Sequence, residues 1–348
     1  MSYNNVIKGV SEGYYVIQLT KDNKFKHYWD IETGEIVHTE PHIRPGDQVT
    51  RNEARNQIKA EKHFQQNKKV GFLQIKRCIR DITNQANQFH SHLLLKLLPL
   101  ISFNENLISL DGKPLNQTQL ALYLGVQRKV ALNFLNVFEE KNILQRVEGN
   151  VKNEKFYRFS SDYLVKGKFE NPEKYSVKVF QKQLIKSIEA VEAVTTTYEK
   201  NKRRRELYPL SLLLMLLTYI NPQTQIICVN YKDNFLNNYP SVNEAIESNN
   251  KLIKRLTYKQ IWNEMTGQKI KKMSKKESDK LKTYFEILKT AKIITTLQEK
   301  DTVFIMNPNL AFVMPYYKDK AWINKIDIMF GSNEEKGNST QQTEKTQV

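Results

Sequence analysis

Apolar and polar side chains alternate near the start of the chain. The alternation covers Tyr14–Leu19, Lys24–Ile31 and Glu35–His38, with turn-forming residues between these segments. A period of two residues is typical of strands with one exposed face. The pattern predicts a small β-meander within residues 1–46. Residues 47–69 are charged with sparse apolar positions, which predicts a solvated helix or arm.

From Val70 onward the apolar spacing becomes helical, and one series of elements occurs twice. The motif Leu-Leu-Leu-x-Leu-Leu-x-x-Ile spans Leu93–Ile101 and again Leu212–Ile220. Each copy is followed by a strand-like segment, a short helix that ends at Gly125 or Gly267, and a longer amphipathic helix. Repetition of an ordered set of elements indicates two copies of one structural unit.

Both copies predict the same five elements. For the first copy these are a strand at Leu107–Leu110, helices at Gln117–Leu124 and Arg128–Lys141, and a hairpin of Ile143–Val147 and Lys155–Phe159. For the second copy they are Gln225–Val229, Tyr258–Met265, Ser274–Lys292, Ile293–Leu297 and Thr302–Met306. Helix, strand, helix–turn–helix and hairpin is the element order of a winged helix. The predicted fold is mainly α with small β elements (α+β), with two winged-helix modules in tandem after the meander.

The remaining segments complete the expected domain organisation. We expect the modules at residues 70–170 and 207–330. Residues 171–206 should form a connecting helix, because apolar positions from Ser176 to Glu206 have helical spacing. Residues 331–348 are polar and lack aromatic side chains, which predicts a disordered tail.

Composition and charge narrow the class of protein. A chain of 348 residues exceeds one ordinary core, and its formal net charge of +17 favours a polyanionic partner. Cys78 and Cys228 are the only cysteines, so a disulfide framework and a cysteine-based zinc site are not expected. No apolar run reaches the roughly 20 residues that span a bilayer. These features predict a cytoplasmic protein without a membrane partner.

The expected modules place polar and basic residues where a winged helix contacts DNA. The second helix of a helix–turn–helix enters the major groove, while its N-terminus and the wing contact phosphates. The predicted contacts in the first module are Gln127, Arg128, Lys129, Asn133, Asn136, Arg146 and Lys152. Those in the second are Lys269, Lys271, Lys272, Lys275, Lys276 and Lys280. Gln, Arg and Asn can pair with base edges, whereas Lys acts as a point charge. The first module is therefore expected to read sequence and the second to hold the backbone.

Two simpler interpretations remain open at this point. Lys269–Lys282 also fits a solvated lysine-rich helix face, and Gln127–Lys129 a generic polar helix start. Lysines at a helix N-terminus repel the helix dipole and each other unless an anion is near. A phosphate backbone would supply that anion.

An enzymatic alternative rests on His90-Ser91-His92. This segment resembles the histidine–hydrophobic–histidine motif of rolling-circle nicking enzymes, in which two imidazoles hold a divalent metal. The motif requires a strand, whereas the spacing here is helical. Metal-dependent nicking is therefore a minor alternative, and we expect no catalytic residue, metal or cofactor.

The first half resembles the RepL-type plasmid replication proteins of Firmicutes and, more loosely, initiators built of two winged helices. The resemblance rests on Asp30–Ile36, on the helix–turn–helix Leu115–Leu144, and on the segments after the hairpins, Phe156–Gly167 and Val303–Phe312. Only the second of these segments carries Asn-Pro, at Asn307. The resemblance implies binding to repeated origin sites and recruitment of host replication proteins without DNA cleavage.

Together these features predict a non-catalytic, sequence-specific double-stranded DNA-binding protein of a plasmid or phage, acting in replication initiation. The alternative is a transcriptional regulator of a mobile element. Host replication or transcription proteins are candidate partners, and a homodimer remains open.

Overall fold

The structure is a computed structural model. It describes the strands within residues 6–41 and most of residues 71–330, except 85, 104–105, 150–153, 168–175, 203–205, 237–238, 249–250, 298–302 and 314–318. The chain divides into two compact units, Met1–Lys62 and His63–Val348. The predicted arm at residues 47–69, the predicted tail at 331–348 and the candidate residue Lys152 lie outside the described residues.

The first unit contains a four-stranded antiparallel meander. Its strands are β1 (Val6–Lys8), β2 (Tyr14–Leu19), β3 (Phe25–Asp30) and β4 (Ile36–Pro41), in that spatial order. The predicted meander is confirmed, and β1 adds a fourth strand that pairs with β2.

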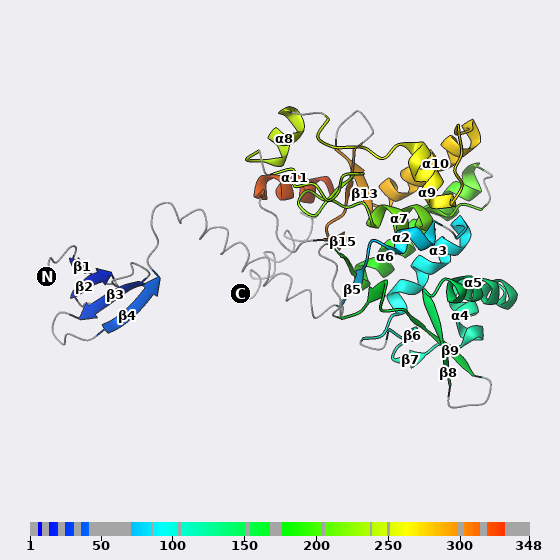
Figure 1. Cartoon of the computed structure of the whole chain (residues 1–348), viewed down its shortest axis with the longest axis horizontal. Helices are drawn as coiled ribbons and strands as arrows, with labels where there is room; N and C mark the ends of the chain where they lie inside the picture. Colours follow the sequence, from blue (N-terminus) through cyan, green and yellow to red (C-terminus); the bar gives the residue numbers. More distant parts are fainter. Residues whose placement is uncertain are drawn as a thin grey trace, which may run out of the picture. The chain divides into compact units, whose positions relative to one another are not determined.

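Within the second unit, the first repeat follows the predicted order of elements (Figure 1). Its helices are α2 (Ile79–Thr83), α3 (Gln88–Leu97), the 3-10 turn η2 (Leu98–Leu100), α4 (Gln117–Leu124) and α5 (Arg128–Glu140). Its strands are β5 (Phe72–Ile75), β6 (Ser109–Leu110), β7 (Lys113–Pro114), β8 (Leu144–Glu148), β9 (Lys155–Phe159) and β10 (Leu164–Val165). The hairpin of β8 and β9 is extended by an isolated bridge between Leu107 and Arg158.

The second repeat presents the same order. Its helices are α6 (Gln181–Lys202), α7 (Pro209–Leu217), α8 (Val242–Ser248), α9 (Tyr258–Thr266), α10 (Lys275–Thr290) and α11 (Lys320–Phe330). Its strands are β11 (Val177–Phe180), β12 (Ile226–Ile227), β13 (Ile294–Thr296), β14 (Phe304–Met306) and β15 (Ala311–Phe312). The α+β class is confirmed. Helices α8 and α11 were not predicted. Helix α8 lies between β12 and α9, and α11 follows β15.

A central four-stranded sheet joins the two repeats. Its spatial order is β10-β5-β11-β15, and all its neighbours are antiparallel. The predicted connecting helix was wrong at its start, because Val177–Phe180 is a strand and the helix begins only at Gln181. Val177 and Phe180 are three residues apart, a spacing that also fits a helix. Val177–Phe180 forms a strand instead of a helix because Val177 pairs with Ile75, about a hundred residues earlier in the chain.

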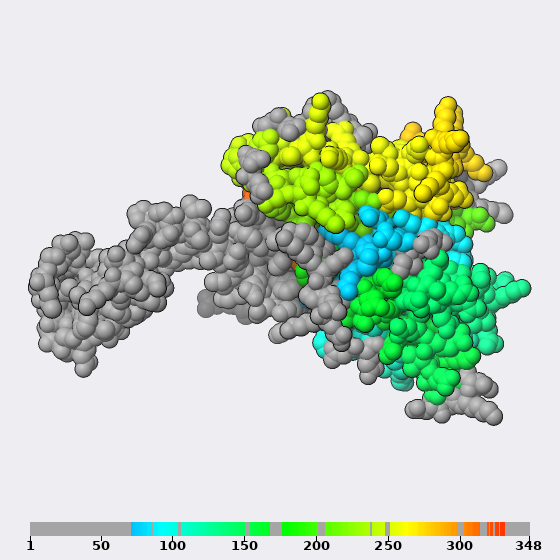
Figure 2. Space-filling view, in the orientation of Figure 1, coloured from blue at the N-terminus to red at the C-terminus, as the bar shows by residue number. Residues whose placement is uncertain are grey.

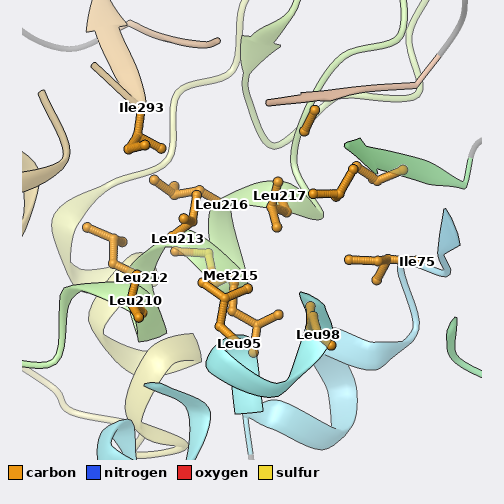
Figure 3. Packing of buried hydrophobic residues seen from close by; sticks show 14 of the residues in the cluster. Ile75, Leu95, Leu98, Leu210, Leu212, Leu213, Met215, Leu216, Leu217 and Ile293 are labelled. Carbon is orange, nitrogen blue, oxygen red and sulfur yellow. The ribbon is translucent and has the colours of Figure 1, made fainter. Parts of the chain in front are cut away.

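The core is continuous across both repeats and centres on α3 and α7, which pack against each other. All nine residues of α7 are buried, as expected for a helix that is apolar around its whole circumference. Figure 3 shows Leu95 and Leu98 of the first repeat gathered in one cluster with Leu213, Met215 and Leu216 of the second. Each fully buried leucine contributes roughly 1.5–3 kcal/mol, so this contact is a major source of stability.

A buried arginine reinforces the contact between repeats. The guanidinium of Arg77 donates hydrogen bonds to the backbone oxygens of Thr218 (2.5 Å) and Ile220 (2.7 Å), just beyond the end of α7. It also lies 4.0 Å from the centre of the Tyr231 ring. Arg77 is 5 % exposed, so its charge is compensated inside the protein by these groups. This residue fixes the start of the first repeat against the second.

Within the part of the chain that the structure describes, every helix is too short or too polar to span a lipid bilayer.

Candidate nucleic-acid interface

The first helix–turn–helix is defined by a cap at each end of α4. The Asn116 side chain accepts hydrogen bonds from the backbone nitrogens of Thr118 and Gln119, and the Gln119 side chain accepts one from the Asn116 nitrogen. This reciprocal capping box starts the helix. At the other end, Gly125 has a φ of 68°, a left-handed conformation that favours glycine. Helix α5 begins three residues later, so the turn is short.

Helix α5 has one buried and one exposed face. Ala131, Phe134, Leu135 and Phe138 are buried at helical spacing. The opposite side carries the exposed predicted contacts Gln127, Arg128, Lys129, Asn133 and Asn136. Gln127 is the N-cap and makes no side-chain capping hydrogen bond. The first turn of α5 therefore presents basic side chains together with backbone N–H groups that no cap side chain occupies.

Two further predicted contacts of the first repeat, Arg146 and Lys152, do not lie on this face of α5. Arg146 is exposed but lies 2.6 Å from Glu139 in an ion pair between β8 and α5. Its charge is already partly balanced within the protein, which makes it a weaker candidate for DNA contact. Lys152 lies outside the described residues.

The second helix–turn–helix repeats these caps around a longer turn. Thr257 and Gln260 form a capping box at the start of α9, and Gly267 ends that helix with a φ of 69°. The turn then runs to Ser274, the N-cap of α10. Five of the predicted lysines are exposed along this turn and the first turn of α10: Lys269, Lys271, Lys272, Lys275 and Lys276. We call these five residues the lysine cluster.

Glu277 changes the interpretation of the lysine cluster. The Ser274 nitrogen donates to the Glu277 carboxylate at 2.7 Å, and the Ser274 hydroxyl accepts from the Glu277 nitrogen at 3.3 Å. These hydrogen bonds with Ser274 lower the pKa of Glu277. A phosphate is therefore not the only anion that could balance these lysines, because the Glu277 carboxylate lies in the first turn of α10. The Ser-x-x-Glu spacing was visible in the sequence as a capping-box signal.

Lys280 lies apart from the lysine cluster. It is partly buried, with its ammonium 5.5 Å from the centre of the Tyr208 ring and 5.8 Å from that of Tyr284. Burial lowers the pKa of Lys280, and Glu206 acts in the opposite direction. The Lys280 ammonium already makes cation–π contacts with these two rings, so Lys280 is a weaker candidate for contact with DNA than its exposed neighbours.

Figure 2 shows residues of α4 and α5 (green) and of α9 and α10 (yellow) at the molecular surface. Exposure selects Gln127, Arg128, Lys129, Asn133 and Asn136 in the first repeat, together with the ion-paired Arg146, and the lysine cluster in the second. The structure thus brings each set onto one helix–turn–helix. Within the described residues, both sets consist of exposed side chains that are positively charged or can form hydrogen bonds.

Of the two histidines of the enzymatic alternative, His90 is buried and His92 is half-buried. His90 packs against Phe134 and Phe138, with ring centres 6.1 and 6.5 Å apart, whereas His92 packs against Tyr208 at 5.7 Å. Burial, followed by the charge of Lys96, lowers the pKa of His92 to about 3. The segment is helical, as expected, and its histidines have separate neighbours. Among the described residues no group of three His, Cys, Asp or Glu side chains could hold a metal ion.

The chain matches no protein-family model, and comparisons with curated proteins and with solved structures find no match.

Proposed function

We propose that the protein binds double-stranded DNA through two winged helices, with α5 and α10 as the recognition helices. The observation that carries the proposal is the pairing of an exposed polar face on α5 with the lysine cluster before and on α10. Both sets occupy the corresponding helix–turn–helix of a repeated unit. A chance distribution of polar and basic residues is not expected to place exposed sets on the helix–turn–helix of both repeats.

Strand order supports the winged-helix assignment. In the second repeat the spatial order is β12-β14-β13, so the strand after the first helix lies beside the returning strand of the hairpin. In the first repeat the Leu107–Arg158 bridge places the corresponding segment beside β9. Helix, strand, two helices and a hairpin closed by the first strand is the arrangement expected of a winged helix.

The chemistry of the two sets suggests different tasks. Arg128 can donate two hydrogen bonds to guanine, and Asn133 and Asn136 can pair with adenine. The lysines are point charges that attract phosphates without distinguishing bases. We therefore assign base reading to α5 and backbone attachment to the lysine cluster.

Site selection from a random duplex library tests this division. The full-length protein should enrich a defined sequence. Arg128→Ala should lose about 1–3 kcal/mol on that sequence and relax the preference at one position. Lys271→Ala with Lys272→Ala should weaken binding to selected and random duplexes alike. Lys186→Ala removes an exposed lysine from α6 and is the matched control, with binding unchanged. Failure to enrich any sequence would contradict base reading.

We further propose that this binding serves replication initiation, on the basis of the resemblance to RepL-type and tandem winged-helix initiators. An initiator supplied in trans should support copying of a plasmid that carries its binding sites. The same assay with Arg128→Ala should fail. If copy number is independent of the protein while transcription from a promoter at its sites changes, the role is regulatory.

A further inference from the structure

The hairpin of β8 and β9 (Figure 1) has one face turned toward the helix–turn–helix of the first repeat and one face turned away from it. On the near face, Arg146 forms the ion pair with Glu139 of α5, and the hydroxyl of Tyr157 accepts a hydrogen bond from the Gln117 side chain of α4 at 2.7 Å. Neighbouring residues of a strand point to opposite faces. The far face of the hairpin is therefore separate from the exposed face of α5.

A cavity of about 550 Å³ opens on the far face of the hairpin. Its polar lining includes Gln145 and Arg158, which lie directly opposite each other in β8 and β9. Its apolar lining comes from Leu107, Val147 and Phe159. Pockets for small organic molecules commonly have volumes of about 300–1,000 Å³ and combine apolar walls with a few polar groups. The cavity has the size and the lining of such a pocket.

Arg158 is exposed and supplies the charge among the described residues that line this cavity. Its Nε donates a hydrogen bond to Oε1 of Gln145 at 2.9 Å, which holds the guanidinium across the hairpin. No carboxylate among the described residues forms an ion pair with Arg158. The N–H groups of a guanidinium match the two oxygens of a carboxylate or phosphate. The charge and geometry at this cavity therefore favour an anionic ligand.

The second repeat shows that the fold does not require an arginine at this position. In the first repeat Arg158 of β9 bridges to Leu107. In the second repeat Ile305 of β14 pairs in the same way with Ile226, and both isoleucines are fully buried. A buried apolar pair thus satisfies the same strand arrangement. The exposed Arg158 and the cavity beside it are features of the first repeat that folding does not explain.

We propose that this cavity binds a small molecule that carries one carboxylate or phosphate group on an apolar body. Arg158 pairs with the anionic group, and the Gln145 amide and the Ser161 hydroxyl supply further hydrogen-bond donors. Leu107 and Val147 contact the apolar body. This site goes beyond the proposed function, because it lies on the other face of the hairpin and needs no DNA.

Ligand-observed NMR titrations of the full-length protein test the site with simple probes. Benzoate and phenyl phosphate carry the two candidate anionic groups on the same apolar ring. Benzamide is the neutral control for benzoate, and inorganic phosphate is the control without an apolar body. At least one of the two aromatic anions should bind about tenfold more tightly than either control, because hydrogen bonds to a charged group are roughly twice as strong as neutral ones. The tighter of the two anions identifies the group that the site prefers.

Three variants assign the binding to this cavity. Arg158→Gln removes the charge and should weaken binding of the preferred anion about tenfold. Val147→Phe keeps Arg158 but fills the cavity, and it should also weaken binding. Arg255→Gln is the matched control, because it removes an exposed arginine from the segment before α9, and it should leave binding unchanged.

Failure of the site is recognised from the same titrations. Equal binding of benzoate, phenyl phosphate and benzamide, or no binding of any probe at millimolar concentration, would overturn the proposal. So would wild-type affinity in both Arg158→Gln and Val147→Phe, which would place the anion elsewhere on this basic protein. None of these results bears on DNA binding, which the site selection above tests separately.

Discussion

Replacing Arg77 with methionine should destabilise the second unit strongly. The substitution keeps most of the side-chain volume but removes the hydrogen bonds to Thr218 and Ile220 and the contact with the Tyr231 ring. Hydrogen bonds from a charged donor contribute about 1.5–3 kcal/mol each, and the ring contact adds about 1 kcal/mol. Relief from burying the charge offsets part of this sum. We expect a net loss of about 3–5 kcal/mol in the free energy of unfolding.

Urea denaturation of the full-length protein, followed by far-UV circular dichroism, measures this loss. Arg128→Met is the matched control, because Arg128 is exposed and should change stability by less than about 0.5 kcal/mol. A loss below about 1 kcal/mol for Arg77→Met would refute the idea that this residue fixes the repeats against each other.

Three further predictions follow from single positions. Gly125→Ala should lower the free energy of unfolding by about 1–2 kcal/mol, measured by thermal or urea denaturation. The loss comes from the left-handed backbone alone, because an added Cβ meets no atom within 4 Å. Gly125→Asn should lose less, and equal losses for the two variants would contradict this explanation. The folded pKa of His92 is about 3, below its ordinary 6.5, so its contribution to stability is complete above pH 6.5 and is lost as the pH falls toward 3. His92→Gln should reduce the acid slope of unfolding free energy by up to about 1.4 kcal/mol per pH unit, and an unchanged slope would count against it. Arg146→Ala should weaken binding to the selected duplex less than Arg128→Ala, because Glu139 already pairs with Arg146; the reverse order in anisotropy titrations would show that the ion pair opens on DNA.

Local signals predicted the helix–turn–helix segments well. Helix α4 has the bounds expected from its apolar spacing, and Gly125 and Gly267 end their helices as predicted. Asn116-x-x-Gln119 and Thr257-x-x-Gln260 are local capping boxes, so their geometry follows from residues three apart. Such features depend on near neighbours, which a single sequence displays directly.

The central sheet could not be predicted in the same way. Strands β10 and β15 have only two residues each, too few for a period to be visible. Their pairing depends on partners more than eighty residues away. Arg77 gave no local signal either, since its role depends on carbonyl oxygens of the other repeat. The contact between the repeats therefore emerged only from the structure.

For the candidate contacts, the sequence predicted which helix or turn each residue occupies, but not how far each side chain is buried. Lys280 and Lys276 are four residues apart on one helix, yet Lys280 lies over Tyr208 while Lys276 is exposed. The difference arises from tertiary packing of α10 against the segment before α7. Exposure therefore reduces the set of candidate DNA contacts that charge alone suggested.

The dependence of DNA affinity on salt tests the central claim most directly. If the lysine cluster neutralises about five phosphates, a plot of log affinity against log salt should have a slope of roughly −4 to −5. Lys271→Ala with Lys272→Ala should make the slope shallower by about 2, whereas Lys186→Ala should leave it unchanged. A near-flat slope for the wild-type protein, or an equal slope for the double variant, would contradict binding of DNA through this surface.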